Sequence, residues 1–169
     1  MKNSPLLIGI TGGIGSGKSL ISSIFNKLGL PVYDADRRAK WLMAHDPNIK
    51  SELIELLGSE SYTEQGLNRS FIARKSFNNE KILTRLNAMV HPEVGADFTR
   101  WVALHDSSPV LLKESALIFE TSSHTELDQI ILVLSPSALR IKRVLARDLH
   151  RDKKDIKAII SRQLPAAET

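Results

Sequence analysis

The stretch from Gly9 to Ser19, GITGGIGSGKS, combines closely spaced glycines with a lysine and a hydroxyl. Gly12, four further residues, and then Gly17, Lys18 and Ser19 match the phosphate-loop pattern G-x-x-x-x-G-K-[ST]. Glycines let successive backbone N–H groups turn inward around phosphate oxygens, and the following helix presents its positive end to them. Lys18 can reach the outer phosphates, and the Ser19 hydroxyl can ligate a bridging Mg²⁺ ion. The sequence therefore predicts a site for a nucleoside triphosphate.

Two further features indicate what is done with the nucleotide. The acids of DAD, Asp34 to Asp36, end a second apolar strand, and strand carboxyl ends share one crevice in a parallel sheet. Arg143 and Arg147 are four residues apart, which places both on one face of a helix. An acid near an acceptor hydroxyl and arginines that close over phosphates are what a small-molecule kinase needs. The guanine-reading pattern Asn-Lys-x-Asp of a GTPase is absent from the sequence.

These residues are positioned by alternating strands and helices. Apolar runs predict strands over residues 5–11, 31–36, 108–115 and 127–135, and helical spacing predicts helices over 17–29, 135–148 and 155–164. The segment from Asp36 to Trp101 is helical in pattern, with breaks at Pro47 and over residues 58–66 and 77–80. This alternation predicts an α/β fold with a parallel sheet and a helical insertion after the second strand.

Composition and charge limit the classes of protein to which the sequence can belong. The 169 residues include no cysteine, so disulfides and cysteine nucleophiles are excluded. Apolar runs are too short to span a bilayer, and the N-terminus lacks the features of a secretory signal, so we expect a cytoplasmic protein without a membrane partner. The net charge is +4, but the densest basic stretch, Arg140 to Lys157, contains three aspartates. It is either a solvated helix face or a set of cations that closes over a phosphorylated small molecule, and we expect no nucleic-acid partner.

The order of several motifs resembles the dephospho-coenzyme A kinase family over essentially the whole chain. The motifs are GITGGIGSGKS, LGLPVYDADRRAK, LNAMVHPEV, ESALIFE and RVLARD. The resemblance implies a three-layer α/β P-loop kinase fold with a parallel sheet, a helical acceptor-binding insert and a lid. It also implies transfer of the γ-phosphoryl group of ATP, with Mg²⁺, to the ribose 3′-hydroxyl of dephospho-coenzyme A.

The resemblance also divides the chain into parts of one kinase unit. Residues 1–36 and 109–169 would form the nucleotide core, with a lid near 140–157, and residues 37–108 would form the acceptor-binding insert. Family members continue past RQLPAAET through a final strand and helix, so we expect the given sequence to be truncated at Thr169. Without that strand the sheet would have a bare edge.

Site residues follow from the resemblance position by position. Asp36 would be the general base, and Lys18 and Arg143 would act on the transferring group, with Ser19 on the metal. Asp34, His91, Pro92 and Glu120 would bind the acceptor. The residues expected to hold ATP are Gly13, Ile14, Gly15, Ser16, Gly17, Lys18, Ser19, Leu20 and Arg147. The family's usual proline before LL-x-E is Ala116 here, so the turn there is expected to differ.

Several alternatives stay open at this stage. His91 could cap or terminate a helix before Pro92 instead of contacting the acceptor. Lys113 and Glu114 could form a local ion pair, which we favour, or Glu114 could assist Mg²⁺. A P-loop regulatory module without an acceptor, or a nucleoside or nucleotide kinase with another acceptor, would fit much of the pattern. The sequence does not determine the oligomeric state or the choice between ATP and GTP.

Overall fold

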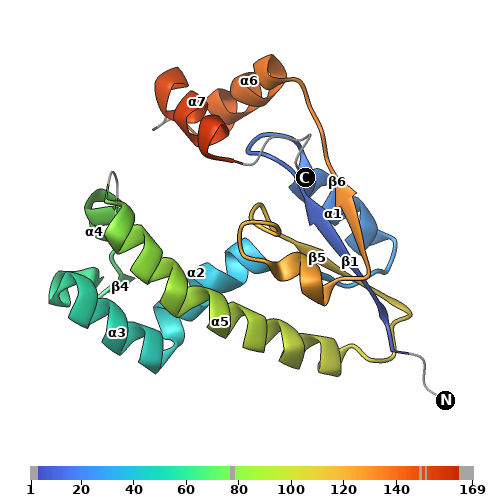
Figure 1. The fold of residues 1–169 in the computed structure, drawn as a ribbon, viewed down its shortest axis with the longest axis horizontal. Coiled ribbons are helices and arrows are strands. Elements are labelled where there is room, and N and C mark those ends of the chain that lie inside the picture. The colour runs from blue at the N-terminus through green and yellow to red at the C-terminus, as the bar shows by residue number, and fades with distance from the viewer. Residues whose placement is uncertain (1–3, 77–78, 149, 151, 164–169) are drawn as a thin grey trace. The chain divides into compact units, whose positions relative to one another are not determined.

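The computed structural model of the chain describes residues 4–76, 79–148, 150 and 152–163. Its internal contacts divide the chain into two compact units. The sheet unit comprises Met1–Asp34 and Trp101–Thr169, and the helical unit comprises Ala35–Arg100. Figure 1 shows the strands of the first unit and the helices of the second.

The sheet unit contains a four-stranded sheet in which each neighbouring pair is parallel. Its strands are β1 (Leu6–Thr11), β2 (Val32–Asp34), β5 (Val110–Glu114) and β6 (Gln129–Leu132), in the order β2-β5-β1-β6. The predicted strands and parallel topology are confirmed. The central strands read as apolar runs because a parallel sheet is usually covered on both faces.

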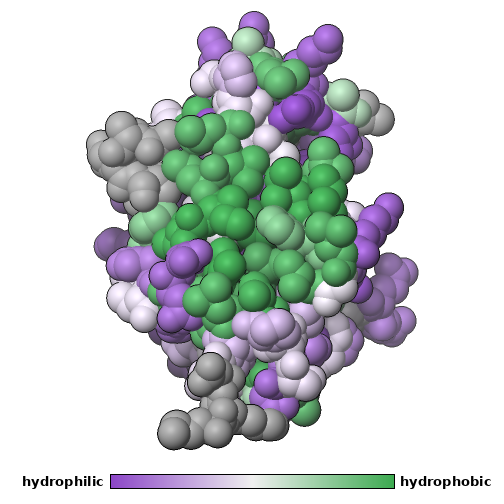
Figure 2. Space-filling model, turned by 90° about the vertical axis from the view of Figure 1, so that its right-hand side faces the viewer, coloured by the Kyte–Doolittle hydropathy of each residue, from purple (hydrophilic) through white to green (hydrophobic). Residues whose placement is uncertain are grey.

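Helix α1 (Lys18–Lys27) follows β1 and packs against β1, β2 and β5. Its other side carries Leu20, Ile24 and Leu28, which recur every fourth residue and are 66%, 46% and 71% exposed. Figure 2 views the molecule from the side on which α1 and β6 lie in Figure 1, and apolar side chains gather broadly on that face. The residues of α1 thus divide between a sheet-facing side and an apolar stripe at the surface.

Helices α6 (Ser137–Arg147) and α7 (Lys153–Arg162) complete the sheet unit and pack against each other. Val144 of α6 and Ile156 of α7 are fully buried. The Asp152 side chain caps α7 by accepting a hydrogen bond from the Asp155 backbone N–H. In return, the Asp155 side chain accepts a hydrogen bond from the Asp152 backbone N–H. This capping box satisfies donors that a helix start leaves unpaired, so α7 has a well-defined first turn.

The helical unit is built from α2 (Ala35–His45), α3 (Pro47–Leu57), α4 (Arg69–Ser76) and most of α5 (Glu80–Leu104). A short 3₁₀ turn and a two-stranded ribbon, β3 (Tyr62–Thr63) with β4 (Gly66–Leu67), join α3 to α4. The core of this unit includes Leu53, Phe71 and Ile72.

A salt bridge also connects helices α2 and α5 of this unit. The Arg38 guanidinium on α2 makes two hydrogen bonds, of 2.8 and 2.7 Å, to the buried carboxylate of Asp97 on α5. A two-point contact of this kind fixes orientation as well as distance.

One local prediction is wrong, and one open alternative is ruled out. Strand β2 ends at Asp34, and Asp36 lies in the first turn of α2, because the chain turns directly from strand into helix. The alternative that His91 ends a helix before Pro92 is ruled out, because Pro92 lies inside α5, which continues to Leu104. Within the described part of the chain, none of the helices has the length and apolar character that crossing a bilayer requires.

Candidate active site

The glycine-rich loop connects the end of β1 at Thr11 to the start of α1 at Lys18. Three of its glycines have positive φ: 149° at Gly12, 75° at Gly15 and 111° at Gly17. At Gly15 an added Cβ would also lie 2.6 Å from the Arg140 carbonyl oxygen. Other residue types rarely adopt such backbone angles, so the loop's shape depends on these glycines.

Two polar groups of the loop have an arrangement suited to an anion. The Ser16 hydroxyl is buried and makes no hydrogen bond to any residue that the structure describes. The Lys18 ammonium lies along the loop and donates to the Gly12 carbonyl at 2.7 Å. An unsatisfied buried hydroxyl beside a cation and a helix start fits a phosphate group.

Ser19 contacts an acid from the neighbouring strand. Its hydroxyl donates to Glu114 Oε1 at 2.9 Å, and Glu114 is the last residue of β5, in register with Ile10 of β1. The favoured ion pair between Lys113 and Glu114 is not formed: the Lys113 ammonium contacts Glu126 at 3.1 Å. Successive residues of a strand point to opposite faces, so only Glu114 can face the loop.

Arginines of α6 lie against the loop. Arg143 Nη1 donates to the Ser16 carbonyl at 3.0 Å and to the Ser135 hydroxyl at 3.2 Å, whereas Arg147 is exposed at the end of the helix. The sequence interpretation missed Arg140, whose Nε donates to the Ile14 carbonyl at 2.8 Å. The spacing of three residues between Arg140 and Arg143 places both on one helix face, and this was the sequence signal that could have identified Arg140.

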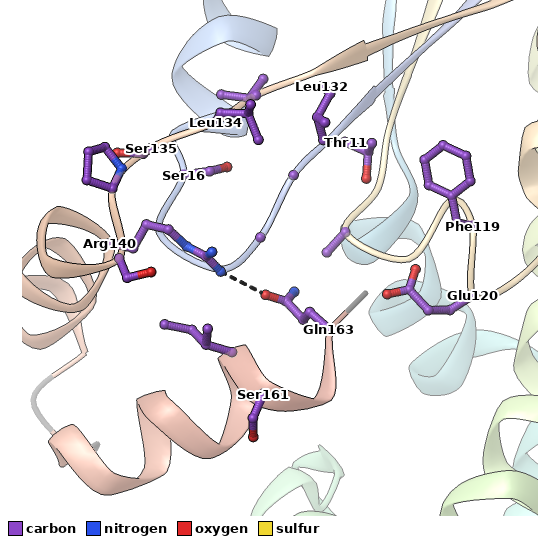
Figure 3. A pocket seen from close by; sticks show the side chains of 17 residues that line it. Thr11, Ser16, Phe119, Glu120, Leu132, Leu134, Ser135, Arg140, Ser161 and Gln163 are labelled. Atoms are coloured by element: carbon purple, nitrogen blue, oxygen red, sulfur yellow. Dashed lines mark hydrogen bonds between the residues drawn. The ribbon is translucent and has the colours of Figure 1, made fainter. Parts of the chain in front are cut away.

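A cavity of about 470 Å³ opens beside the loop. It is lined by loop residues, by the segment after β6 and by the end of α7, and Glu120 and Phe119 border it from the segment after β5 (Figure 3). Glu120, expected to bind the acceptor, thus lies at the same cavity as Ser16 of the loop. Gln163, a second residue that the sequence interpretation missed, lines it too.

The two acids of DAD belong to different units. Asp34 ends β2 and is in register with Glu114 of β5, so it belongs to the same edge of the sheet as the loop. Asp36 is exposed in the first turn of α2 in the helical unit. Its role toward an acceptor stays a prediction.

His91 and Pro92 lie in the middle of α5, in the helical unit. Burial lowers the pKa of the His91 imidazole below its usual range, which favours the neutral ring at neutral pH. A neutral imidazole can both accept and donate a hydrogen bond, which suits contact with polar groups of the substrate that receives the phosphoryl group.

The sequence is similar to one family over nearly its whole length. The profile of the family described as dephospho-CoA kinase matches residues 6–169. A dephospho-CoA kinase of Porphyromonas gingivalis is 42% identical over 143 residues, which cover 85% of this chain and 70% of the relative. A dephospho-CoA kinase of Leptospira interrogans is 41% identical over 163 residues, covering 96% of this chain and 78% of the relative.

Two solved structures share the fold of this chain. The crystal structure of TT1252 from Thermus thermophilus superposes with a TM-score of 0.85 at 32% identity, covering 98% of this chain and 84% of that one. A dephospho-CoA kinase from Campylobacter jejuni superposes with a TM-score of 0.65 at 23% identity, covering 92% and 78%. The second likeness supports the P-loop kinase fold alone.

The loop geometry predicts that Gly15→Ala disrupts the site far more than Gly29→Ala. Both glycines have positive φ, so each alanine costs about 1–2 kcal/mol of backbone strain. Only at Gly15 does the new Cβ also meet a backbone oxygen, whereas nothing lies within 4 Å at Gly29. We expect Gly15→Ala to weaken ATP binding at least about tenfold, because several donors at about 1 kcal/mol each lose their direction. Calorimetric titration measures this, and equal ATP affinities in the two variants would contradict the role of the loop.

Proposed function

The chain belongs to the dephospho-CoA kinase family. We propose that its glycine-rich loop, its lid near residues 140–157 and its helical unit each carry out one part of the family's reaction. The reaction is transfer of the γ-phosphoryl group of ATP to the ribose 3′-hydroxyl of dephospho-coenzyme A. One observation carries the proposal: the Ser19 hydroxyl, in the first turn of α1, is hydrogen-bonded to the buried acid Glu114, beside glycines held at positive φ.

The loop's share is to hold the ATP phosphates. The backbone N–H groups of residues 13–20 would direct their partial positive charges at the phosphate oxygens, and α1 would add its positive N-terminal end. Lys18 exchanges its contact with the Gly12 carbonyl for the outer phosphates. Interactions that strengthen as charge moves to the leaving oxygen lower the barrier rather than only tightening binding.

Ser19 and Glu114 would hold Mg²⁺ together with phosphate oxygens. The Ser19 hydroxyl donates its proton to Glu114, which leaves its lone pairs directed away from the carboxylate and open to a cation. No cluster of three or more acidic or histidine side chains able to hold a metal occurs among the described residues, and Mg²⁺ usually takes most of its ligands from phosphates and water. When bound, the ion would neutralise charge on the phosphates.

The arginines of α6 would act as a lid over the phosphates. Arg143 already donates to the Ser16 carbonyl, and Arg147 is exposed one turn further along the same helix face. We assign Arg143 to the transferring group and Arg147 to the nucleotide. A closed lid would exclude water, which otherwise competes with the acceptor hydroxyl.

The helical unit, with Asp36, His91 and Pro92, would receive the acceptor. Asp36 is the proposed general base, and it lies in the first turn of α2, where the helix dipole favours a charged carboxylate. We also assign Asp34 and Glu120 of the sheet unit to the acceptor; Asp34 shares the sheet edge with Glu114.

A direct transfer assay tests the proposed activity. We expect labelled γ-phosphate to pass from ATP to dephospho-coenzyme A, with the product's new phosphate at the 3′ position by ³¹P NMR. Adenosine and AMP, offered at the same concentration, should accept much less, and chelation of Mg²⁺ should stop transfer. Preferred transfer to adenosine or AMP would indicate a nucleoside or nucleotide kinase, and ATP binding without any transfer would indicate a regulatory module.

The proposed base predicts a specific loss in Asp36→Asn. A ribose hydroxyl is a poor nucleophile at neutral pH, and proton transfer to a positioned carboxylate typically contributes about 10²–10⁴-fold. The amide keeps the shape but accepts no proton, so single-turnover transfer should fall at least about a hundredfold while ATP affinity changes little.

Asp34→Asn serves as the matched comparison for Asp36→Asn. A smaller effect on the transfer rate is expected there, with a rise in the KM for dephospho-coenzyme A. A larger loss in Asp34→Asn than in Asp36→Asn would reassign the base, and a loss of ATP affinity in Asp36→Asn would make that residue part of the metal site.

A further inference from the structure

Gln163, the residue that follows α7, reaches the phosphate loop with its side chain. Its Oε1 accepts the backbone N–H of Ile14 at 2.9 Å and an N–H of Arg140 Nη2 at 3.1 Å. Figure 3 shows the Arg140 and Gln163 side chains pointing toward one another at the cavity beside the loop. One neutral oxygen therefore takes a loop N–H and a guanidinium N–H at the same time.

These two donors are of the kinds that bind phosphate oxygens. Backbone N–H groups of a glycine-rich loop and arginine guanidinium groups are recurrent phosphate ligands in proteins. Ile14 lies within the loop, two residues after Gly12, and its carbonyl is held by Arg140 Nε at 2.8 Å. Arg140 and Ile14 thus form a fixed pair, in which the Ile14 N–H and one Arg140 Nη2 N–H are directed at one point.

Among the residues that the structure describes, Arg140 has no anionic partner. It is half-buried, burial lowers the pKa of its guanidinium, and its contacts within the described part of the chain are all to neutral oxygens. Gly13 has no positive φ, but a Cβ there would collide with the Arg140 guanidinium, so the glycine leaves room for this arginine. Partial burial removes some of the water around this cation, which favours an anion at this point.

We propose that the Ile14 N–H and the Arg140 guanidinium form a subsite for an oxygen of the outermost phosphate, and that Gln163 is an internal competitor for that subsite. The proposal rests on the proposed ATP-binding function. One N–H serves one good acceptor, so the phosphate and Gln163 exclude each other. ATP binding then requires Gln163 to leave the loop, which frees the end of α7 as the nucleotide enters.

Competition lowers the apparent affinity by the fraction of molecules in which the subsite is open. Removing the competitor in Gln163→Ala should therefore tighten binding of the imido analogue of ATP, with Mg²⁺, by about five- to thirtyfold, the equivalent of two hydrogen bonds. Gln163→Glu should weaken it at least about tenfold, because a carboxylate holds Arg140 more strongly and repels phosphate. Inorganic tripolyphosphate should follow the same order.

Calorimetric titration of three variants and the wild type tests the proposal. Ser161→Ala is the matched control, because Ser161 lines the same cavity but its hydroxyl bonds, among the described residues, only to the Ala158 carbonyl of α7. The affinity of this variant for the analogue should stay within twofold of wild type. Unchanged or weaker analogue binding in Gln163→Ala would overturn the proposal, and so would wild-type affinity in Gln163→Glu.

A second measurement requires no ligand. Hydrogen exchange of the Ile14 amide, followed by ¹⁵N NMR, should be faster in Gln163→Ala than in the wild type and in Ser161→Ala; equal exchange would overturn the contact. If the wild type binds the analogue and only the expected gain in Gln163→Ala is missing, the competitor is wrong and the kinase function stands. If the wild type does not bind the analogue, the ATP-binding function fails, and the proposal fails with it.

Discussion

The structure depends on one constraint: the backbone between Thr11 and Lys18 must turn sharply as it joins a buried strand to a helix. That path needs positive φ at Gly12, Gly15 and Gly17, which only glycine adopts without strain. The rest of the sheet unit supports the path. Strand β5 brings Glu114 to Ser19, and α6 places Arg143 against the Ser16 carbonyl.

Charge is distributed around the loop in a consistent way. Cations from three positions, Lys18, Arg140 and Arg143, all donate to loop carbonyls, so positive charge is concentrated at the loop. The carboxylate of Glu114 contacts the Ser19 hydroxyl, on the side of the loop where α1 begins. In a kinase site the phosphate oxygens and a metal cation must lie within a few ångströms of each other. This arrangement gives the phosphate oxygens and the cation separate positions.

Much of this could be predicted from the sequence, because the loop pattern and the apolar strands are local signals. The boundary at Asp34 and Asp36 could not, since a strand that passes directly into a helix looks like one extended segment. The Lys113–Glu114 pair was mispredicted because adjacency in sequence suggested contact, whereas strand alternation separates the two side chains. Gln163 and Arg140 carry no motif of their own, and their contacts with Ile14 join residues more than a hundred positions apart.

The central claim is that the loop stabilises charge that develops during phosphoryl transfer, and Lys18→Met tests it most directly. The variant keeps the length of the side chain and removes its charge, and Lys27→Met at the other end of α1 is the control. Single-turnover transfer to dephospho-coenzyme A should fall by about 10²–10³-fold, with a much smaller change in affinity for the imido analogue of ATP. A transfer rate within a few-fold of wild type would contradict the account, because the loop would then bind the nucleotide without acting on the transition state.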